Sequence, residues 1–215
     1  MKKIVFVTIP IQPIQGEGWD PQGYIYKFDE NKKYEYNDKV HFAINGFLAK
    51  TLTNDDEVKI IQILVNSSKS KAKENAEIQQ KELDAIKKNI GADIEIKYEQ
   101  FITDFNDTGK TIEKRFRDLI GKLEEDSQIV FDMTYGTKTM IPVMFYVLGF
   151  AEKFFNADIK NILYDKVEFE NNHPIPGTCE LHDVTSLYYL NSLASVMAAP
   201  DGKTALARLD KFFEL

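Results

Sequence analysis

The chain has 215 residues, of which 43% are hydrophobic and 28% charged, as expected for one globular domain, or for a domain with a modest appendage. The net charge of −7 and the presence of only three arginines argue against a protein that coats long DNA or RNA. Such proteins carry a basic face that neutralises phosphates. The single cysteine, Cys179, excludes a disulfide within the chain, and we expect it to be a packing residue.

Apolar runs alternate with helical periods along the first 170 residues. In chain order, we expect a strand over 4–11, a helix over 37–52, a strand over 58–65, a helix over 70–90, a strand over 94–98, a helix from Asp107 or Thr108 to about 123, a strand over 128–133, a helix over 138–155 and a strand over 159–169. The short continuous apolar runs are typical of strands buried on both faces. Five strand–helix alternations predict a Rossmann-like, doubly wound, mostly parallel sheet.

The ends of the chain predict an appendage and a cytoplasmic location. The apolar run near Met1 is broken by Pro10 and Pro13 without a small-residue cleavage site, so we interpret it as a strand and not as a signal peptide. The later run over 140–151 is too short to span a bilayer. The two prolines within 171–177 mark a boundary, which predicts a Rossmann-like domain over 1–170 and a loop with a short helical extension over 171–215.

Ligands of an open parallel sheet bind at the carboxyl ends of its strands, near the point where the strand order reverses. Three segments follow predicted strands there: 10–23, 66–68 and 132–140. In the last, Gly136 lets the backbone approach a ligand, and the helix start that follows suits an anion. Lys138 is unfavourable at a helix N-terminus unless a phosphate lies nearby, so the segment is either a phosphate site or a capped turn with a solvated lysine.

The pattern Asp132-x-Thr134-x-Gly136-Thr137-Lys138-x-Met140 resembles the signature loop of CARF domains (CRISPR-associated Rossmann fold). Tyr135 stands where the two common forms of that loop carry Gly or His. The resemblance extends over about residues 1–170 through the strand–helix order. It implies a homodimer that binds cyclic tetra- or hexa-adenylate across its two-fold axis, in type III CRISPR antiviral defence.

The resemblance also implies site residues. The expected ligand contacts from the signature loop are Thr134, Tyr135, Gly136 and Thr139, and the expected catalytic residues are Thr137 and Lys138. Position in the fold adds contacts from the two earlier loops, namely Gln12, Gln15, Asn66 and Ser67. The implied chemistry needs no metal or other cofactor, because a ribose 2′-OH attacks the adjacent phosphate while Lys138, assisted by Thr137, stabilises the growing charge. The sequence identifies no general base.

Two functions of different classes follow, because the chain is too short for a typical fused effector. One is a ring nuclease that cleaves the messenger and ends the signal. The other is a sensor that binds the messenger and acts through a separate partner. A Rossmann-like regulator for another nucleotide is a third reading.

Several motifs are judged to be decoys. The segment 108–111 resembles the end of a P-loop, but Asp104 stands where the first glycine belongs. None of the three histidines follows an arginine at the spacing of the effector ribonucleases of this system.

Two further expectations concern residues outside these motifs. Tyr24 and Tyr26 are candidate stacking platforms for adenine, and the acidic residues of 70–90 are expected to form a solvated face.

Overall fold

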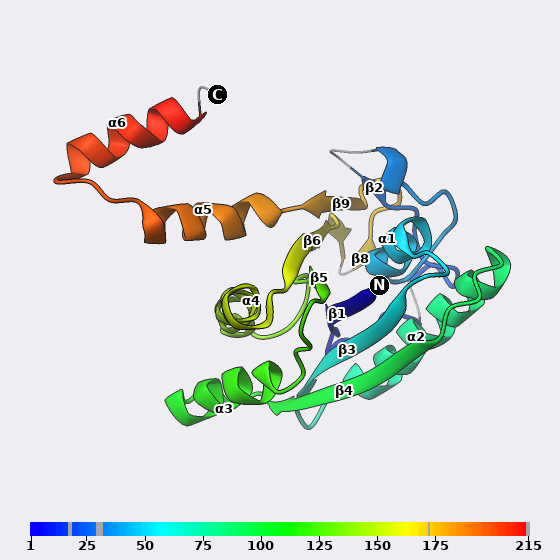
Figure 1. Cartoon of the computed structure of the whole chain (residues 1–215). Coiled ribbons are helices and arrows are strands. Elements are labelled where there is room, and N and C mark those ends of the chain that lie inside the picture. Colours follow the sequence, from blue (N-terminus) through cyan, green and yellow to red (C-terminus); the bar gives the residue numbers. More distant parts are fainter. Residues whose placement is uncertain (17–18, 29–31, 172, 214–215) are drawn as a thin grey trace. The chain divides into compact units, whose positions relative to one another are not determined.

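The computed structural model describes residues 1–16, 19–28, 32–171 and 173–213 (Figure 1). The strands are β1 (Lys2–Thr8), β2 (Lys27–Phe28), β3 (Glu57–Asn66), β4 (Ile96–Asp104), β5 (Gln128–Asp132), β6 (Asp158–Lys166), β7 (Phe169–Glu170), β8 (His173–Pro174) and β9 (Glu180–Asp183). The helices are α1 (Ala43–Thr51), α2 (Ala72–Asn89), α3 (Gly109–Ile120), α4 (Met140–Phe155), α5 (Thr185–Val196) and α6 (Gly202–Phe213), with a 3₁₀ turn at Lys32–Tyr34.

The sheet has seven strands in the order β2-β9-β6-β5-β1-β3-β4. β1 lies inside it and pairs in parallel with β3 on one side and β5 on the other. The chain moves from β1 to β3 and β4, and then returns to the other side of β1 for β5 and β6. The strand order therefore reverses between β1 and β5, and the predicted Rossmann-like, mostly parallel fold is confirmed.

Two helix layers enclose the sheet: α1 and α2 lie on one side of it, and α3 and α4 on the other (Figure 1). Side chains alternate along each strand, so Val5 and Val7 belong to the core cluster that α1 and α2 complete. Ile4 and Phe6 point to the opposite face and are equally buried. This double burial explains why β1 reads as an unbroken apolar run.

The boundaries differ from the expected ones where a strand lies near an edge of the sheet. β4 pairs only with β3 and runs to Asp104, several residues beyond the predicted strand, because an edge strand tolerates polar residues on its exposed positions. The sheet also continues past the boundary expected after residue 170. β9 pairs antiparallel with β6, with Leu163 opposite Asp183, and the first compact unit ends at Val184.

Residues 185–215 form a second compact unit, within which α5 and α6 are described. They are separated near Pro200, as the sequence indicated. Both helices expose large apolar side chains, among them Leu187 and Leu206. None of the helices described is both long enough and apolar enough to cross a membrane.

Arg115, on α3, is the largest fully buried side chain of the described chain. Its guanidinium donates to Thr103 Oγ1 on β4 at 2.7 Å, to Asp107 Oδ1 at 2.5 Å and to Thr139 Oγ1 at 2.9 Å. It also donates to the main-chain oxygens of Asp104 and Asn106. One planar group thus joins the end of β4, the start of α3 and the N-cap of α4.

Replacing Arg115 should destabilise the fold because several acceptors would lose their donor at once. We expect Arg115→Met to lower the free energy of unfolding by about 2–3 kcal/mol, measured by urea denaturation. The matched control is Arg117→Met on the same helix, where the side chain is exposed and a change within about 0.5 kcal/mol is expected. Equal losses in the two variants would contradict a role for the buried network.

Candidate functional site

A cavity of about 910 Å³ lies at the carboxyl ends of β1, β3, β4 and β5, where the strand order reverses. This volume is near the upper end of the range of about 300–1,000 Å³ that is usual for small-molecule sites. Its described lining comprises Pro10, Ile11, Gln12, Pro13, Ile14, Gln15, Trp19, Val65, Phe105, Thr134, Tyr135, Gly136, Thr137, Phe169 and His173. None of these residues is a Lys, Arg, Asp or Glu.

The loop after β1 (the β1 loop, residues 9–16) forms one wall, and the first turns of α2 hold it in place. Asn75, which is buried, donates from Nδ2 to the main-chain oxygens of Pro10 at 2.8 Å and Gln12 at 2.7 Å. The backbone N–H of Lys71 donates to the oxygen of Ile11 at 2.9 Å. These bonds satisfy main-chain carbonyls of the loop that have no partner within a strand or helix, and they fix the path of the chain past the cavity.

The loop after β5 (the β5 loop, residues 133–139) forms the facing wall. Asp132 accepts hydrogen bonds from the N–H of Thr134 at 3.0 Å and from its hydroxyl at 2.5 Å. Thr8, at the end of β1, donates from its hydroxyl to the main-chain oxygen of Asp132 at 2.9 Å and accepts the N–H of Tyr135 at 2.8 Å. The Asp-x-Thr part of the motif therefore shapes the loop, and Thr8 ties it to the neighbouring strand.

The rest of the β5 loop is held from the α3 side. Thr137 and Thr139 share a hydroxyl–hydroxyl hydrogen bond of 3.1 Å, and Thr139 accepts from Arg115. Burial opposes ionisation of Asp107, but hydrogen bonds from Arg115, Thr139 and Thr137 outweigh it and hold the pKa of that carboxyl below its usual value. Thr139 is thus engaged in the scaffold and is not among the residues that line the cavity.

The structure brings together most, though not all, of the predicted site residues. The predicted residues that line the cavity are Gln12, Gln15, Thr134, Tyr135, Gly136 and Thr137. Asn66 and Ser67 lie at the same edge of the sheet, at the end of β3, but they do not line the cavity. Val65 and Phe105 line the cavity on the side of β3 and β4. Lys138 is exposed and lies outside the lining. Because α4 begins at Met140 with Thr139 as its N-cap, Lys138 precedes the helix and does not lie in its first turn.

Aromatic side chains that sequence reasoning did not assign to the site also line the cavity. Trp19, Phe105 and Phe169 line the cavity together with His173, and Phe105 and Phe169 are 57% and 58% exposed. They come from segments that are distant in sequence, with Phe169 on β7 and His173 on β8, and no pattern in the chain joins them. The tyrosines that the sequence offered as stacking platforms, Tyr24 and Tyr26, are instead buried in the core cluster.

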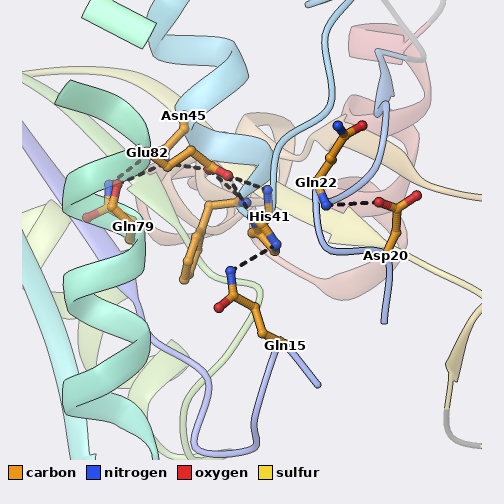
Figure 2. Close-up of polar contacts among 8 residues, drawn as sticks. Gln15, Asp20, Gln22, His41, Asn45, Gln79 and Glu82 are labelled. Carbon is orange, nitrogen blue, oxygen red and sulfur yellow. Dashed lines mark hydrogen bonds and ion pairs between the residues drawn. The ribbon is translucent and has the colours of Figure 1, made fainter. Parts of the chain in front are cut away.

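A second polar network lies beside the β1 loop, between α1 and α2 (Figure 2). Glu82, on α2, accepts hydrogen bonds from His41 and from the N-terminal end of α1, and His41 in turn contacts Gln15 of the cavity wall. The Glu82 side chain is only 14% exposed. This corrects the expectation that all the acidic residues of 70–90 are solvated: positions 75, 79 and 82 fall on the same helical face as the apolar stripe, which is the signal that was missed.

Two buried carboxyls lie next to the β5 loop. Burial raises the pKa of Asp132 to about 6, although its hydrogen bonds from Thr134 favour the ionised form. Burial also raises the pKa of Asp165 well above its usual value, and the nearby charge of Asp132 adds to the shift. Asp165 is linked to the loop through its backbone N–H, which donates to Thr134 Oγ1 at 2.9 Å.

Sequence comparison assigns no family. No protein-family model matches the chain, and none of the curated proteins is significantly similar to it in sequence. The site is therefore defined by its own geometry: a sheet whose strand order reverses at β1, and a partly aromatic cavity at that reversal whose described lining carries no Lys, Arg, Asp or Glu. Within the described part of the chain, no group of three or more His, Cys, Asp and Glu side chains could hold a metal ion.

The backbone conformation at position 136 requires a glycine. Its φ is +103°, and a Cβ built there would meet Met140 and Thr8 only at ordinary contact distances of 3.6 and 3.7 Å. We expect Gly136→Ala to cost about 1–3 kcal/mol of unfolding free energy, since an L side chain rarely adopts that φ. Gly109→Ala is the control, because Gly109 begins α3 with open space around it; it should be neutral or slightly stabilising in the same thermal and urea unfolding experiments.

Because the pKa values of Asp132 and Asp165 are raised in the folded state, we expect their contribution to the free energy of unfolding to fall as pH rises. A folded-state pKa above the unfolded value of 3.8 favours the fold below about pH 4, and that advantage is lost as pH rises through about 6 for Asp132, a loss of about 3 kcal/mol. Asp165→Asn should therefore raise the free energy of unfolding at pH 8 and change it little at pH 4. The exposed Asp93→Asn is the control; the same pH dependence in both variants would contradict this account.

Proposed function

We propose that this protein binds a cyclic oligoadenylate, the second messenger of type III CRISPR defence, and cleaves it as a metal-independent ring nuclease that switches the signal off. The observation that carries the proposal is the cavity at the β1–β5 reversal, one wall of which is the Asp-x-Thr-x-Gly-Thr-Lys loop that resembles CARF domains. Open α/β sheets bind nucleotides at this position.

The chemistry of the lining supports a nucleotide with few phosphates. Bases stack on aromatic faces, and Trp19, Phe105 and Phe169 supply such faces at the cavity. Amides and hydroxyls from Gln12, Thr134 and their neighbours provide hydrogen bonds without a strong charge. A long nucleic acid would call for a basic surface, which the net charge of −7 argues against.

Cleavage needs no water molecule or cofactor as a reactant. A ribose 2′-oxygen attacks the adjacent phosphorus, the bond from phosphorus to the 5′-oxygen breaks, and the 2′-OH proton passes to that departing oxygen. The products are a 2′,3′-cyclic phosphate and a 5′-OH. The walls hold the sugar and phosphate in line, which supplies proximity and orientation. Thr137 offers a hydroxyl in the cavity, and Lys138, the next residue, offers a cation for the charge that grows on the phosphate oxygens.

The second candidate is a sensor that binds the ring without cleaving it. Lys138 is exposed and is not among the residues that line the cavity, and the described residues of the lining include no carboxylate that could act as a general base. A sensor would transmit binding through a separate partner.

The proposed ligand also calls for a homodimer, because a symmetric ring fits a two-fold axis. Apolar side chains on the outer face of α4 support self-association: Tyr146 is 70% exposed and Phe154 is 59% exposed. A dimer in multi-angle light scattering, with or without ligand, is the expected result, and a monomer in both conditions would count against the proposal.

The deciding experiment incubates the purified protein with cyclic tetra- and hexa-adenylate in EDTA and separates the products by chromatography. Linear products that end in a 2′,3′-cyclic phosphate are expected. Lys138→Ala should reduce the cleavage rate at least about 100-fold while weakening binding much less, as for the loss of a group that stabilises developing charge. Lys110→Ala, an exposed lysine at the start of α3, is the matched control and should cleave normally.

The other outcomes are equally informative. Intact ring retained by the wild-type protein would favour the sensor. Equal losses of cleavage and binding in Lys138→Ala would make that lysine a binding residue only. Neither binding nor cleavage of either ring would overturn the proposed function.

A further inference from the structure

We infer that Gln15 determines which base the cavity accepts, and that His41 and Glu82 are positioning residues which fix the orientation of its side-chain amide. The inference rests on the proposed function, in that the ligand is taken to be a ring of nucleotides. It adds the reason why the bases should be adenines: the cavity offers a hydrogen-bond acceptor that suits the amino group of adenine.

The polar network that orients Gln15 starts at Glu82, whose carboxylate is surrounded by N–H donors. Oε1 accepts from the backbone N–H of His41 at 2.7 Å and from His41 Nδ1 at 2.9 Å. Oε2 accepts from the backbone N–H of Phe42 at 3.2 Å and from Asn45 Nδ2 at 2.8 Å. The carboxylate also caps the N-terminus of α1, where the helix dipole favours a negative charge.

Buried amides hold this carboxylate in place. Asn45 Nδ2 also donates to the main-chain oxygen of Gln79 at 3.0 Å, and Gln79 Nε2 donates to Asn45 Oδ1 at 2.8 Å. Gln62 on β3 donates to Gln79 Oε1 at 2.7 Å. Figure 2 shows Gln79, Asn45 and Glu82 in succession on the way to His41. Since these amides are buried and satisfied, the network is rigid, and the ring of His41 cannot turn without breaking it.

Glu82 fixes the tautomer of His41. A carboxylate in contact with Nδ1 requires Nδ1 to carry the proton, which leaves Nε2 of the neutral ring as a hydrogen-bond acceptor. Nε2 lies 3.2 Å from Gln15 Nε2, so the amide nitrogen of Gln15 donates to it (Figure 2). The reversed amide would set the carbonyl oxygen of Gln15 against the lone pair of the ring, and is disfavoured.

The fixed amide presents one kind of group to the cavity. Gln15 lines it, and within the described chain Gln15 Oε1 accepts no hydrogen bond. The exocyclic amino group of adenine is a donor that suits this oxygen, whereas hypoxanthine and guanine carry an acceptor oxygen at the same ring position. A base with an oxygen there would face Oε1 directly, and the amide could not reverse without opposing His41. The cavity therefore selects for adenine partly by repelling its keto counterparts.

The test compares the affinity of the full-length protein for two rings by calorimetry: cyclic tetra-adenylate and cyclic tetra-inosinate, both with 2′-O-methyl riboses that block cleavage. The wild-type protein should bind the adenine ring at least about tenfold more tightly. Gln15→Met should lower that ratio by about tenfold, mainly by improving the binding of the inosine ring. His41→Phe should lower it in the same direction while leaving Gln15 in place.

The ratio of the two affinities distinguishes a positioning role from a merely structural one, because damage to the fold weakens the binding of both rings alike. Gln22→Met is the matched control: Gln22 is an exposed glutamine that does not line the cavity, and its variant should keep the wild-type ratio. If His41→Phe fails to fold, the exposed Gln15 still provides the test. Binding of the adenine ring with an unchanged ratio in Gln15→Met would overturn this inference alone. Binding of neither ring by the wild-type protein would overturn the proposed function, and this inference with it.

Discussion

The hydroxyl of Thr8 is the interaction on which the geometry of the cavity depends. It lies at the end of the interior strand β1, is fully buried, donates to the main-chain oxygen of Asp132 on β5 and accepts the N–H of Tyr135. It thereby couples the strand that starts one wall to the loop that forms the other. Where the strand order reverses, the loops after β1 and β5 lead to opposite sides of the sheet and leave a gap between them. The two hydrogen bonds of Thr8 fix the distance between the two strands at the point where this gap starts.

Each wall is then held by a polar group buried on the corresponding side of the sheet. Asn75 of α2 fixes the β1 loop through two main-chain oxygens, and Arg115 of α3 fixes the N-cap of α4 through Thr139. Buried polar groups of this kind contribute little net stability when they are satisfied, but they are costly to leave unpaired, so they specify one arrangement of the loops. The cavity can therefore remain open without losing its shape.

The fold could be predicted because its interior strands have no choice of environment. β1, β3 and β5 are buried on both faces, so their unbroken apolar runs mark them and the parallel order follows from the helices between them. β4 was harder to place, since an edge strand is stabilised by its one neighbour and not by its own apolar content. β9 was also missed; it has only four residues and lies next to the opposite edge, between β6 and the two-residue β2. The β5 loop could be located because it follows an interior strand and contains a glycine whose φ is +103°.

The sequence by itself determined the mostly parallel, doubly wound sheet and located the loops after β1 and β5, because local periodicity and the right-handed crossover leave few alternatives. The strand order, with its reversal between β1 and β5, came from the tertiary structure. Only the tertiary structure decided which side chains share the cavity. Phe105, which follows β4, and Phe169, on β7, both line it, and Glu82 faces inward on a helix whose sequence is mostly polar. These relations depend on distances between segments far apart in the chain, which no residue pattern encodes. The pairing of Glu82 on α2 with His41, which directly precedes α1, is the clearest case.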